Sequence, residues 1–222
     1  MTSLEAARLI DISAVRTHHS IDDITEIVDI AKKYRFINVH VLPSWVKELS
    51  DLISSESDIY VGAPVGFPSG GHTTTVKLEE AKRLIKDGVQ EMDIVMNIGR
   101  FKNKQYDYVV DELTQIVKLA PKDVLTKVII EINTLSDDEV VKACECVMSS
   151  GADFVKTGTG WIAGDANIDR IRKIMEICDS KIKVKAAGGI RTLQEFKLLC
   201  EMGVQRMGIN SKSAIEIVEQ LV

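Results

Sequence analysis

The sequence predicts an α/β fold of the (β/α)8 class, a TIM barrel that fills residues 1–222 as a single domain. Eight short runs rich in β-branched residues are each followed by a longer stretch with apolar residues at helical spacing. Dividing 222 residues by eight gives about 28 residues per unit, close to the length of a βαβ element. Regular alternation of strands and helices implies a parallel sheet, and eight units close it into a barrel. The open doubly wound alternative requires Gly-x-Gly-x-x-Gly after the first strand, and the sequence lacks it there.

Each predicted element follows from its own residue pattern, taken in chain order. The strands are the short β-branched runs Arg8–Ile12, Ile37–Leu42, Tyr60–Val65, Glu91–Asn97, Thr126–Ile132, Asp153–Thr157, Ile182–Ala186 and Gln205–Ile209. The helices are the longer periodic stretches at 21–34, 43–54, 74–87, 106–119, 137–149, 167–178, 192–201 and 211–220.

Local signals mark several helix ends. Ser136 precedes Glu139 by three positions, and Thr192 precedes Glu195 by three, which is the spacing of a helix-capping box. Other helical runs end at a glycine, which predicts a left-handed residue that turns the chain into the next strand. These glycines are Gly88, Gly151 and Gly203.

Composition and charge limit the partners and the compartment. The chain has 28 Lys+Arg and 33 Asp+Glu, a net charge of −5, with 45% hydrophobic and 27% charged residues. This balance is typical of a globular protein and disfavours nucleic acid or an anionic membrane as the main partner. The start Met-Thr-Ser-Leu-Glu-Ala-Ala-Arg lacks the pattern of a secretory signal, so we expect a cytoplasmic protein. No apolar run approaches the roughly 18 residues of a membrane span.

Cysteine and histidine spacing predicts neither a disulfide framework nor a metal site. The sequence contains no CxxC pair and no histidine at zinc-ligand spacing from a cysteine. His18 and His19 precede a helix and have no partner at ligand spacing. We therefore expect the cysteines to be free thiols, namely Cys144, Cys146, Cys178 and Cys200.

Two lysines stand in otherwise apolar strands. Lys156 lies in Asp153-Phe-Val-Lys-Thr and Lys185 in Ile182-Lys-Val-Lys-Ala, on strands that are neighbours in a barrel. Ion-paired or snorkelling lysines at the barrel rim are the structural alternative. A lysine with the usual pKa of about 10.4 is neutral in only about 1 of 2,500 molecules at pH 7. Burial and a second nearby cation lower the pKa, and this combination produces an amine that attacks carbonyls.

An acid lies on one face of the fourth predicted strand. Alternation places Asp93, Val95 and Asn97 on the same face. A structural ion pair and a proton shuttle for a Schiff base are both open for this carboxylate. Lys127 and Glu131 have matching parity on the fifth strand, so we expect them to form a polar layer that orients Asp93.

Glycine-rich turns follow the last two strands. Ala187-Gly-Gly-Ile-Arg-Thr192 follows the seventh strand, and Gly208-Ile-Asn-Ser211 follows the eighth and begins the last helix. Glycines let backbone N–H groups approach an anion, and a helix N-terminus adds about half a positive charge. The loops after strands seven and eight often bind phosphate in barrels. Tight turns without a ligand are the alternative.

Four motifs resemble deoxyribose-phosphate aldolases, a family of class I aldolases. They are Glu91-Met-Asp-Ile-Val-Met-Asn-Ile-Gly99, Lys127-Val-Ile-Ile-Glu131, Asp153-Phe-Val-Lys-Thr-Gly-Thr-Gly-Trp161 and Lys183-Val-Lys-Ala-Ala-Gly-Gly-Ile-Arg-Thr192, within a match from about Leu9 to Ser211. The resemblance implies a cofactor-free barrel that cleaves 2-deoxyribose 5-phosphate to acetaldehyde and glyceraldehyde 3-phosphate. It also implies that Lys156 forms the Schiff base, Lys185 perturbs it and Asp93 relays protons.

The same resemblance implies which residues contact the substrate. The phosphate would bind to Gly160, Gly188, Gly189, Gly208 and Ser211. Further substrate-binding positions would be Asp11, Ser13, His40 and Thr159.

Several positions depart from the family pattern. The first strand has Ile12 in place of the usual His, the second has His40 in place of Cys, and Gly158 and Asn210 each replace a Ser. The sequence ends at Leu221-Val222 without the Tyr-ended tail of some members. These changes leave two alternatives open: an aldolase for another phosphorylated sugar, and a non-catalytic phosphosugar-binding barrel. We expect a homo-oligomer, and specifically a dimer.

Overall fold

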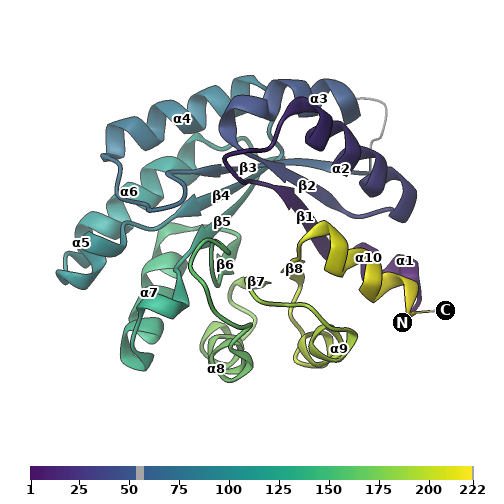
Figure 1. The fold of residues 1–222 in the computed structure, drawn as a ribbon. Helices are drawn as coiled ribbons and strands as arrows, with labels where there is room; N and C mark the ends of the chain where they lie inside the picture. Colours follow the sequence, from purple (N-terminus) through teal and green to yellow (C-terminus); the bar gives the residue numbers. More distant parts are fainter. Residues whose placement is uncertain (54–57, 222) are drawn as a thin grey trace.

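The strands form one closed parallel barrel. The computed structural model describes residues 1–53 and 58–221, so residue 54, the end of the predicted helix 43–54, and residue 222 lie outside the described part. Within that part, eight strands pair in chain order and the last pairs with the first, which confirms the predicted (β/α)8 barrel (Figure 1). They are β1 (Ile10–Ala14), β2 (Asn38–Val41), β3 (Tyr60–Val65), β4 (Glu91–Val95), β5 (Leu125–Ile129), β6 (Phe154–Lys156), β7 (Lys183–Ala187) and β8 (Arg206–Gly208).

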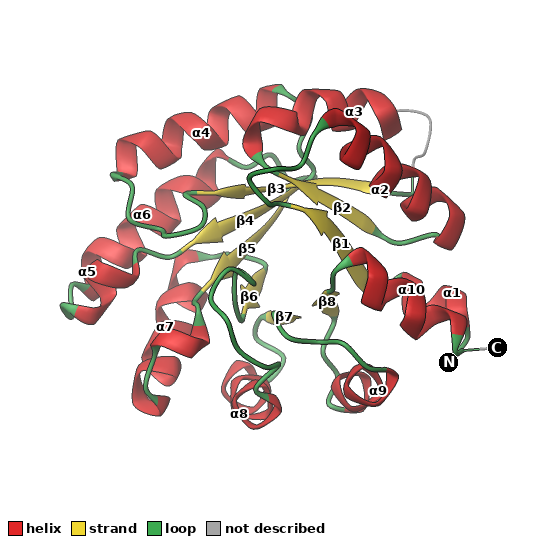
Figure 2. Cartoon of the chain, viewed as in Figure 1, coloured by secondary structure: helices red, strands yellow, loops and turns green. Residues whose placement is uncertain are grey.

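Helices surround the barrel on its outside (Figure 2). They are α1 (Ser3–Ala7), α2 (Ile21–Tyr34), α3 (Val46–Ile53), α4 (Thr74–Lys86), α5 (Ile98–Lys102), α6 (Tyr106–Leu119), α7 (Asp137–Ser150), α8 (Ile168–Cys178), α9 (Leu193–Glu201) and α10 (Ser211–Glu219), with 3-10 turns η1 (Pro43–Trp45) and η2 (Ile132–Thr134). In the part of the chain that is described, none of them is long and apolar enough to cross a membrane. The first and last helices pack together, because Ser3 Oγ donates to the Val218 carbonyl at 3.0 Å.

The predicted bounds of β1 were wrong by two residues. The chain begins with α1, and Arg8 is its C-terminal cap, so the strand starts at Ile10 and continues to Ala14. The helix predicted from residue 43 starts as the turn η1, with Pro43 at its first position. The short helices α1 and α5 and the turn η2 were not predicted.

Five strands were predicted too long, namely β2, β4, β5, β6 and β8, and the largest excess lies at the carboxyl ends of the predicted strands Glu91–Asn97 and Thr126–Ile132. β4 ends at Val95, and Asn97 caps α5 by accepting the Arg100 N–H with its side chain at 3.2 Å. β5 ends at Ile129, and η2 follows a left-handed Glu131 with φ of 52°. An asparagine such as Asn97 can cap a helix instead of continuing a strand. Strand propensity alone therefore overestimates the length of the strand before it.

The predicted capping boxes and glycine stops are confirmed. Ser136 with Glu139 and Thr192 with Glu195 form reciprocal capping boxes at the starts of α7 and α9. The predicted left-handed glycines have φ of 97°, 81° and 81° at Gly88, Gly151 and Gly203. The cysteines are free thiols, as expected.

Strand alternation separates two environments. Val39, Ile94, Val128, Val155 and Val184 are fully buried in the apolar core. Residues of the opposite parity contact one another inside the barrel, and many are charged. The apolar layer holds the sheet and helices together, and the polar interior supplies side chains to the carboxyl ends of the strands.

Candidate active site

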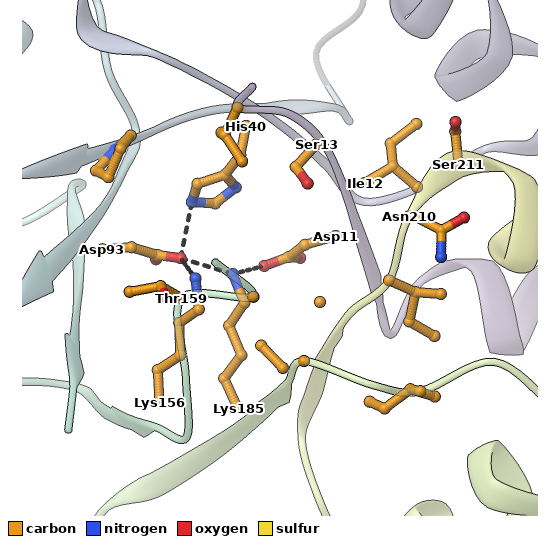
Figure 3. Close-up of a pocket in the computed structure, with 18 of the residues that line it drawn as sticks. Asp11, Ile12, Ser13, His40, Asp93, Lys156, Thr159, Lys185, Asn210 and Ser211 are labelled. Carbon is orange, nitrogen blue, oxygen red and sulfur yellow. Dashed lines mark hydrogen bonds and ion pairs between the residues drawn. The ribbon is translucent and has the colours of Figure 1, made fainter. Parts of the chain in front are cut away.

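A pocket of about 370 Å³ opens at the carboxyl ends of the barrel strands. This size is typical of small-molecule sites. Every substrate-binding and catalytic residue expected from the sequence lines it: Asp11, Ser13, His40, Asp93, Lys156, Thr159, Gly160, Lys185, Gly188, Gly189, Gly208 and Ser211. Figure 3 shows His40, Lys156 and Lys185 converging on Asp93.

The two lysines share one carboxylate oxygen. Lys156 is the last residue of β6, and the strand register pairs its Cα with that of Lys185 on β7. Both ε-amino groups donate to Asp93 Oδ2, at 2.7 Å from Lys156 and 2.8 Å from Lys185. Lys156 is 8% exposed, whereas Lys185 and Asp93 are 1% and 0% exposed. Of the two amines, that of Lys156 therefore has the greater access to the pocket.

A second polar layer supports this group. Lys127 Nζ lies 3.4 Å from Asp93 Oδ1 and also pairs with Glu91. Arg206 pairs with Glu91 and with Asp11, and Asp11 Oδ2 lies 2.6 Å from Lys185 Nζ. The pairs connect both layers and restrict the movement of Asp93.

The lysine and arginine side chains of the cluster outnumber its carboxylates by one. Among the residues that the structure describes, the carboxylates are Asp11, Glu91 and Asp93, and the lysines and arginine are Lys127, Lys156, Lys185 and Arg206. A buried cation without a compensating anion is costly. The charge balance therefore favours the neutral form of one base.

Lys156 is the base whose protonation is weakened. Burial lowers the pKa of Lys156 to about 8, since desolvation and the nearby Lys185 outweigh the attraction of Asp93. For Lys185, burial also acts to lower the pKa, but the Asp11 and Asp93 carboxylates outweigh it and raise the pKa above its ordinary value. At pH 7 a pKa of about 8 leaves about a tenth of the Lys156 side chains neutral.

Glu131 does not orient Asp93, contrary to the expectation, whereas Lys127 contacts it. The Glu131 carboxylate accepts the Thr159 N–H at 3.1 Å and also the Thr159 hydroxyl. The reason is that β5 ends before Glu131, whose left-handed backbone starts a turn. Glu131 instead holds the loop that carries Thr159 and Gly160.

One corner of the pocket is suited to an anion. Gly160, Gly188 and Gly189 have φ of 72°, 94° and 83°, values that favour glycine. Gly208 ends β8, and Ser211 is the first residue of α10. Glycine turns expose backbone N–H groups, and the positive end of α10 faces the same corner.

Two arginines that line the pocket were not predicted from the sequence. Arg16 Nη2 donates to the Gly160 carbonyl at 2.8 Å, and Arg191 follows the glycine turn after β7. Arg16 and His19 were missed because the predicted first strand ended at Ile12. The observed β1 continues to Ala14, and the loop that follows it lines the pocket. Arg206, in the second polar layer, was not predicted either. A charged residue within an otherwise apolar strand is the sequence signal that could have identified it.

Three of the four family departures alter the pocket wall, namely Ile12, His40 and Asn210. Gly158 lies behind the wall, where a Cβ atom would approach Glu131 Oε1 to 2.9 Å.

Trp161 donates its indole N–H to the Val15 carbonyl at 3.1 Å and packs edge-on against Phe67. Trp161 therefore packs between two loops.

Comparison with known proteins adds an independent observation. The sequence model for DeoC/LacD family aldolases matches residues 11–208. A deoxyribose-phosphate aldolase of Sinorhizobium medicae is 42% identical over 217 residues, covering 97% of this chain and 87% of the relative. One from Thermococcus kodakarensis is 40% identical over 221 residues, covering 99% and 98%.

Solved structures have the same fold. An aldolase called QR15 superposes with a TM-score of 0.91 at 37% identity, covering 98% of this chain and 96% of that one. A deoxyribose phosphate aldolase from Aeropyrum pernix, described as having a unique tetrameric structure, gives a TM-score of 0.89 at 26% identity, with coverages of 99% and 92%.

Proposed function

This chain belongs to the DeoC/LacD family of aldolases, and we propose that it cleaves and forms 2-deoxy-D-ribose 5-phosphate through a Schiff base on Lys156. Cleavage yields acetaldehyde and D-glyceraldehyde 3-phosphate, so the protein is a lyase of carbohydrate degradation. The observation that carries this proposal is the Lys156 amine, buried beside a second lysine and a shared carboxylate.

Lys156 supplies the covalent step. Its neutral amine adds to the substrate aldehyde, and loss of water gives a protonated imine. The imine accepts the electron pair of the bond between its α- and β-carbons while the β-hydroxyl loses its proton to water held by Asp93, which releases glyceraldehyde 3-phosphate and leaves an enamine. Protonation of the enamine carbon and hydrolysis then release acetaldehyde and free Lys156.

Asp93 and Lys185 keep this amine ready for reaction. Burial, with a further contribution from Lys185, lowers the pKa of Lys156, while the Asp93 carboxylate holds both nitrogens in place. With water, Asp93 also carries protons to and from the intermediates. Asp11, Ser13, Thr159 and His40 contact the sugar from the remaining wall of the pocket. The Schiff-base reaction uses no cofactor and no metal ion.

The phosphate binds at the corner built by Gly160, Gly188, Gly189, Gly208 and Ser211. The positive end of α10 and the guanidinium groups of Arg16 and Arg191 support an anion at this corner. The carbonyl end of the sugar then extends from this corner toward Lys156.

The assembly and the compartment stay predictions. A dimer and a cytoplasmic location are expected from the sequence, as is the absence of nucleic acid among the partners. A molar mass from light scattering measures the assembly directly.

The function is tested by incubating the purified protein with 2-deoxyribose 5-phosphate and measuring both products with separate coupled assays. We expect equal amounts of acetaldehyde and glyceraldehyde 3-phosphate. Binding of the sugar phosphate without either product would contradict the proposal and favour a non-catalytic barrel. Fast turnover of another sugar phosphate, with none of 2-deoxyribose 5-phosphate, would show that the other sugar phosphate is the substrate.

The pH dependence follows from the state of Lys156. Only the neutral amine attacks, so kcat/KM rises with pH and levels off above a midpoint near the Lys156 pKa of about 8. Below that midpoint the rate falls about tenfold per pH unit. The measurement is kcat/KM in buffers of constant ionic strength, and a rate that declines as the pH increases through 8 would contradict this assignment.

Gly189→Ala tests the phosphate corner. A Cβ atom at Gly189 would lie 2.5 Å from the Ala166 nitrogen, so the turn must move. We expect KM for 2-deoxyribose 5-phosphate to increase about tenfold or more, equivalent to about 1.4 kcal/mol. Exchange of the methyl protons of acetaldehyde, which has no phosphate, should continue at the wild-type rate.

Gly151→Ala is the matched control. Gly151 has a similar φ of 81° and lies at the C-terminus of α7, and a Cβ atom added there would have no neighbour within 4 Å. It therefore introduces the same backbone strain, about 1–2 kcal/mol, without touching the pocket. Equal changes of KM in both variants would argue against the phosphate corner.

A further inference from the structure

A buried carboxylate holds the loop that follows β6. Glu131 is 4% exposed, and its Oε2 atom accepts both the Thr159 N–H, at 3.1 Å, and the Thr159 hydroxyl. The hydroxyl oxygen in turn accepts the N–H of Trp161 at 3.0 Å. In the described part of the chain Glu131 has no ion pair. The hydrogens of Thr159 are therefore what compensates for the burial of this carboxylate.

The backbone on both sides of the Glu131 side chain is fixed. Ile132 donates its N–H to the Thr157 carbonyl at 2.9 Å. Thr134 donates its N–H and its hydroxyl to the Glu131 carbonyl, at 3.0 Å and 2.8 Å. Gly158 leaves the space that the carboxylate occupies, since a Cβ atom there would lie 2.9 Å from Glu131 Oε1. The carboxylate is thus a fixed point to which the loop is tied.

The segment tied to Glu131 forms one side of the phosphate corner. Arg16 Nη2 donates to the Gly160 carbonyl at 2.8 Å, so bonds hold the chain both before and after the Gly160 N–H. That N–H has no acceptor among the residues that the structure describes. A Cβ atom on Gly188 would lie 4.0 Å from the Gly160 nitrogen, so the two glycine turns are adjacent. The Gly160 N–H is therefore available to an anion at this corner.

We propose that Glu131 is a positioning residue for the substrate phosphate, which keeps the Gly160 N–H in place by accepting both hydrogens of Thr159. Gly160 has a left-handed φ of 72°, and a glycine segment without such bonds has many conformations. An anion would then have to order the loop as it binds, at the expense of affinity. Glu131 thus determines the affinity for phosphorylated substrates without touching the reacting atoms. This inference rests on the proposed aldolase function and deepens it.

The same bonding pattern occurs at the opposite end of the barrel. Asp153 Oδ2 accepts the Thr126 N–H at 2.8 Å and the Thr126 hydroxyl at 2.9 Å. Thr126 lies near the amino end of β5, and Asp153 directly precedes β6. Asp153 lines no part of the pocket. Loss of this pair therefore removes the same kind of bonds without affecting the phosphate corner.

Glu131→Met tests the inference, because methionine has a similar length and accepts neither hydrogen of Thr159. We expect KM for 2-deoxyribose 5-phosphate to increase about 10- to 100-fold, with kcat within threefold of wild type. The kcat/KM for 2-deoxyribose without phosphate should also stay within threefold. Glu131→Gln keeps one oxygen that accepts both hydrogens, so its KM should stay within threefold of wild type. Asp153→Leu is the matched control and should keep all three quantities.

A measurement without turnover gives an independent result. Calorimetry with inorganic phosphate should show that Glu131→Met weakens the Kd about as much as it raises KM, whereas Asp153→Leu leaves it unchanged. An unchanged Kd in Glu131→Met would overturn the inference, whether or not the sugar phosphate is cleaved. A wild-type protein that binds phosphate but cleaves neither sugar would overturn the aldolase function instead.

The kinetic outcomes separate positioning from loss of structure. Equal losses for the phosphorylated and unphosphorylated sugars, a KM in Glu131→Met within threefold of wild type, or the same rise in Glu131→Gln would each overturn the inference. Should Glu131→Met not fold, as judged by its melting temperature, Glu131→Asp replaces it. Aspartate keeps the charge, but its side chain is one methylene shorter and cannot reach both hydrogens. We expect the same rise in KM, and a wild-type KM would overturn the inference.

Discussion

Lys156→Met is expected to reduce turnover of 2-deoxyribose 5-phosphate by at least about 10⁴-fold, the scale of losses that follow removal of a catalytic nucleophile. Methionine has a similar length and no amine, so it cannot add to the aldehyde. The substitution also removes the excess cation of the cluster, since Lys156 is the base whose pKa burial lowers to about 8. The variant should therefore melt at or above the wild-type temperature.

Lys122→Met is the control for this experiment, because Lys122 is exposed and lies before β5, outside the pocket. It should keep wild-type turnover and melting temperature. Steady-state kinetics and thermal melts on the three proteins give both quantities. Turnover by Lys156→Met within tenfold of wild type would show that the covalent step uses another group.

Asp93→Asn is expected to reduce turnover by about 10² to 10⁴, the usual contribution of a proton-transfer group. Asparagine has the same shape but neither carries the proton nor balances the lysines that contact Asp93 Oδ2. Because the Asp93 charge raises the pKa of Lys156, its removal should shift the midpoint of Lys156 trapping to lower pH. Uncompensated buried cations should also destabilise the fold by about 3–5 kcal/mol.

The direction of the trapping midpoint distinguishes this account from simple loss of structure. Trapping by acetaldehyde and borohydride is measured across pH in wild type, in Asp93→Asn and in Asp123→Asn, whose parent side chain is exposed. Asp123→Asn should match wild type. A midpoint that moves to higher pH in Asp93→Asn would contradict the electrostatic role of Asp93.

The barrel was predictable because each strand and helix carries a local signal. The helices α2 and α6 and the strand β3 have the predicted bounds, since their periodicity is not interrupted by capping residues. The errors occurred where a side chain prefers a cap to a strand, as Asn97 does. A single residue of this kind decides where an element ends, and apolar periodicity does not detect it.

The pocket was predictable where strand parity decides the direction of a side chain. Lys156, Lys185 and Asp93 follow from alternation and from the rule that barrel sites lie at the carboxyl ends of strands. Glu131 was misplaced because its left-handed backbone breaks that alternation. The contacts of Asn38 and Gly62 with His40 join different strands or depend on amide orientation, so they required the three-dimensional register.

The most direct measurement of the central claim is reduction with borohydride in the presence of acetaldehyde, followed by peptide mapping by mass spectrometry. The account predicts a single ethyl group on the Lys156 nitrogen and none on Lys185, with labelling that increases as the pH rises toward 8. Labelling of Lys185 in place of Lys156, or an unlabelled protein that still cleaves the sugar phosphate, would contradict it.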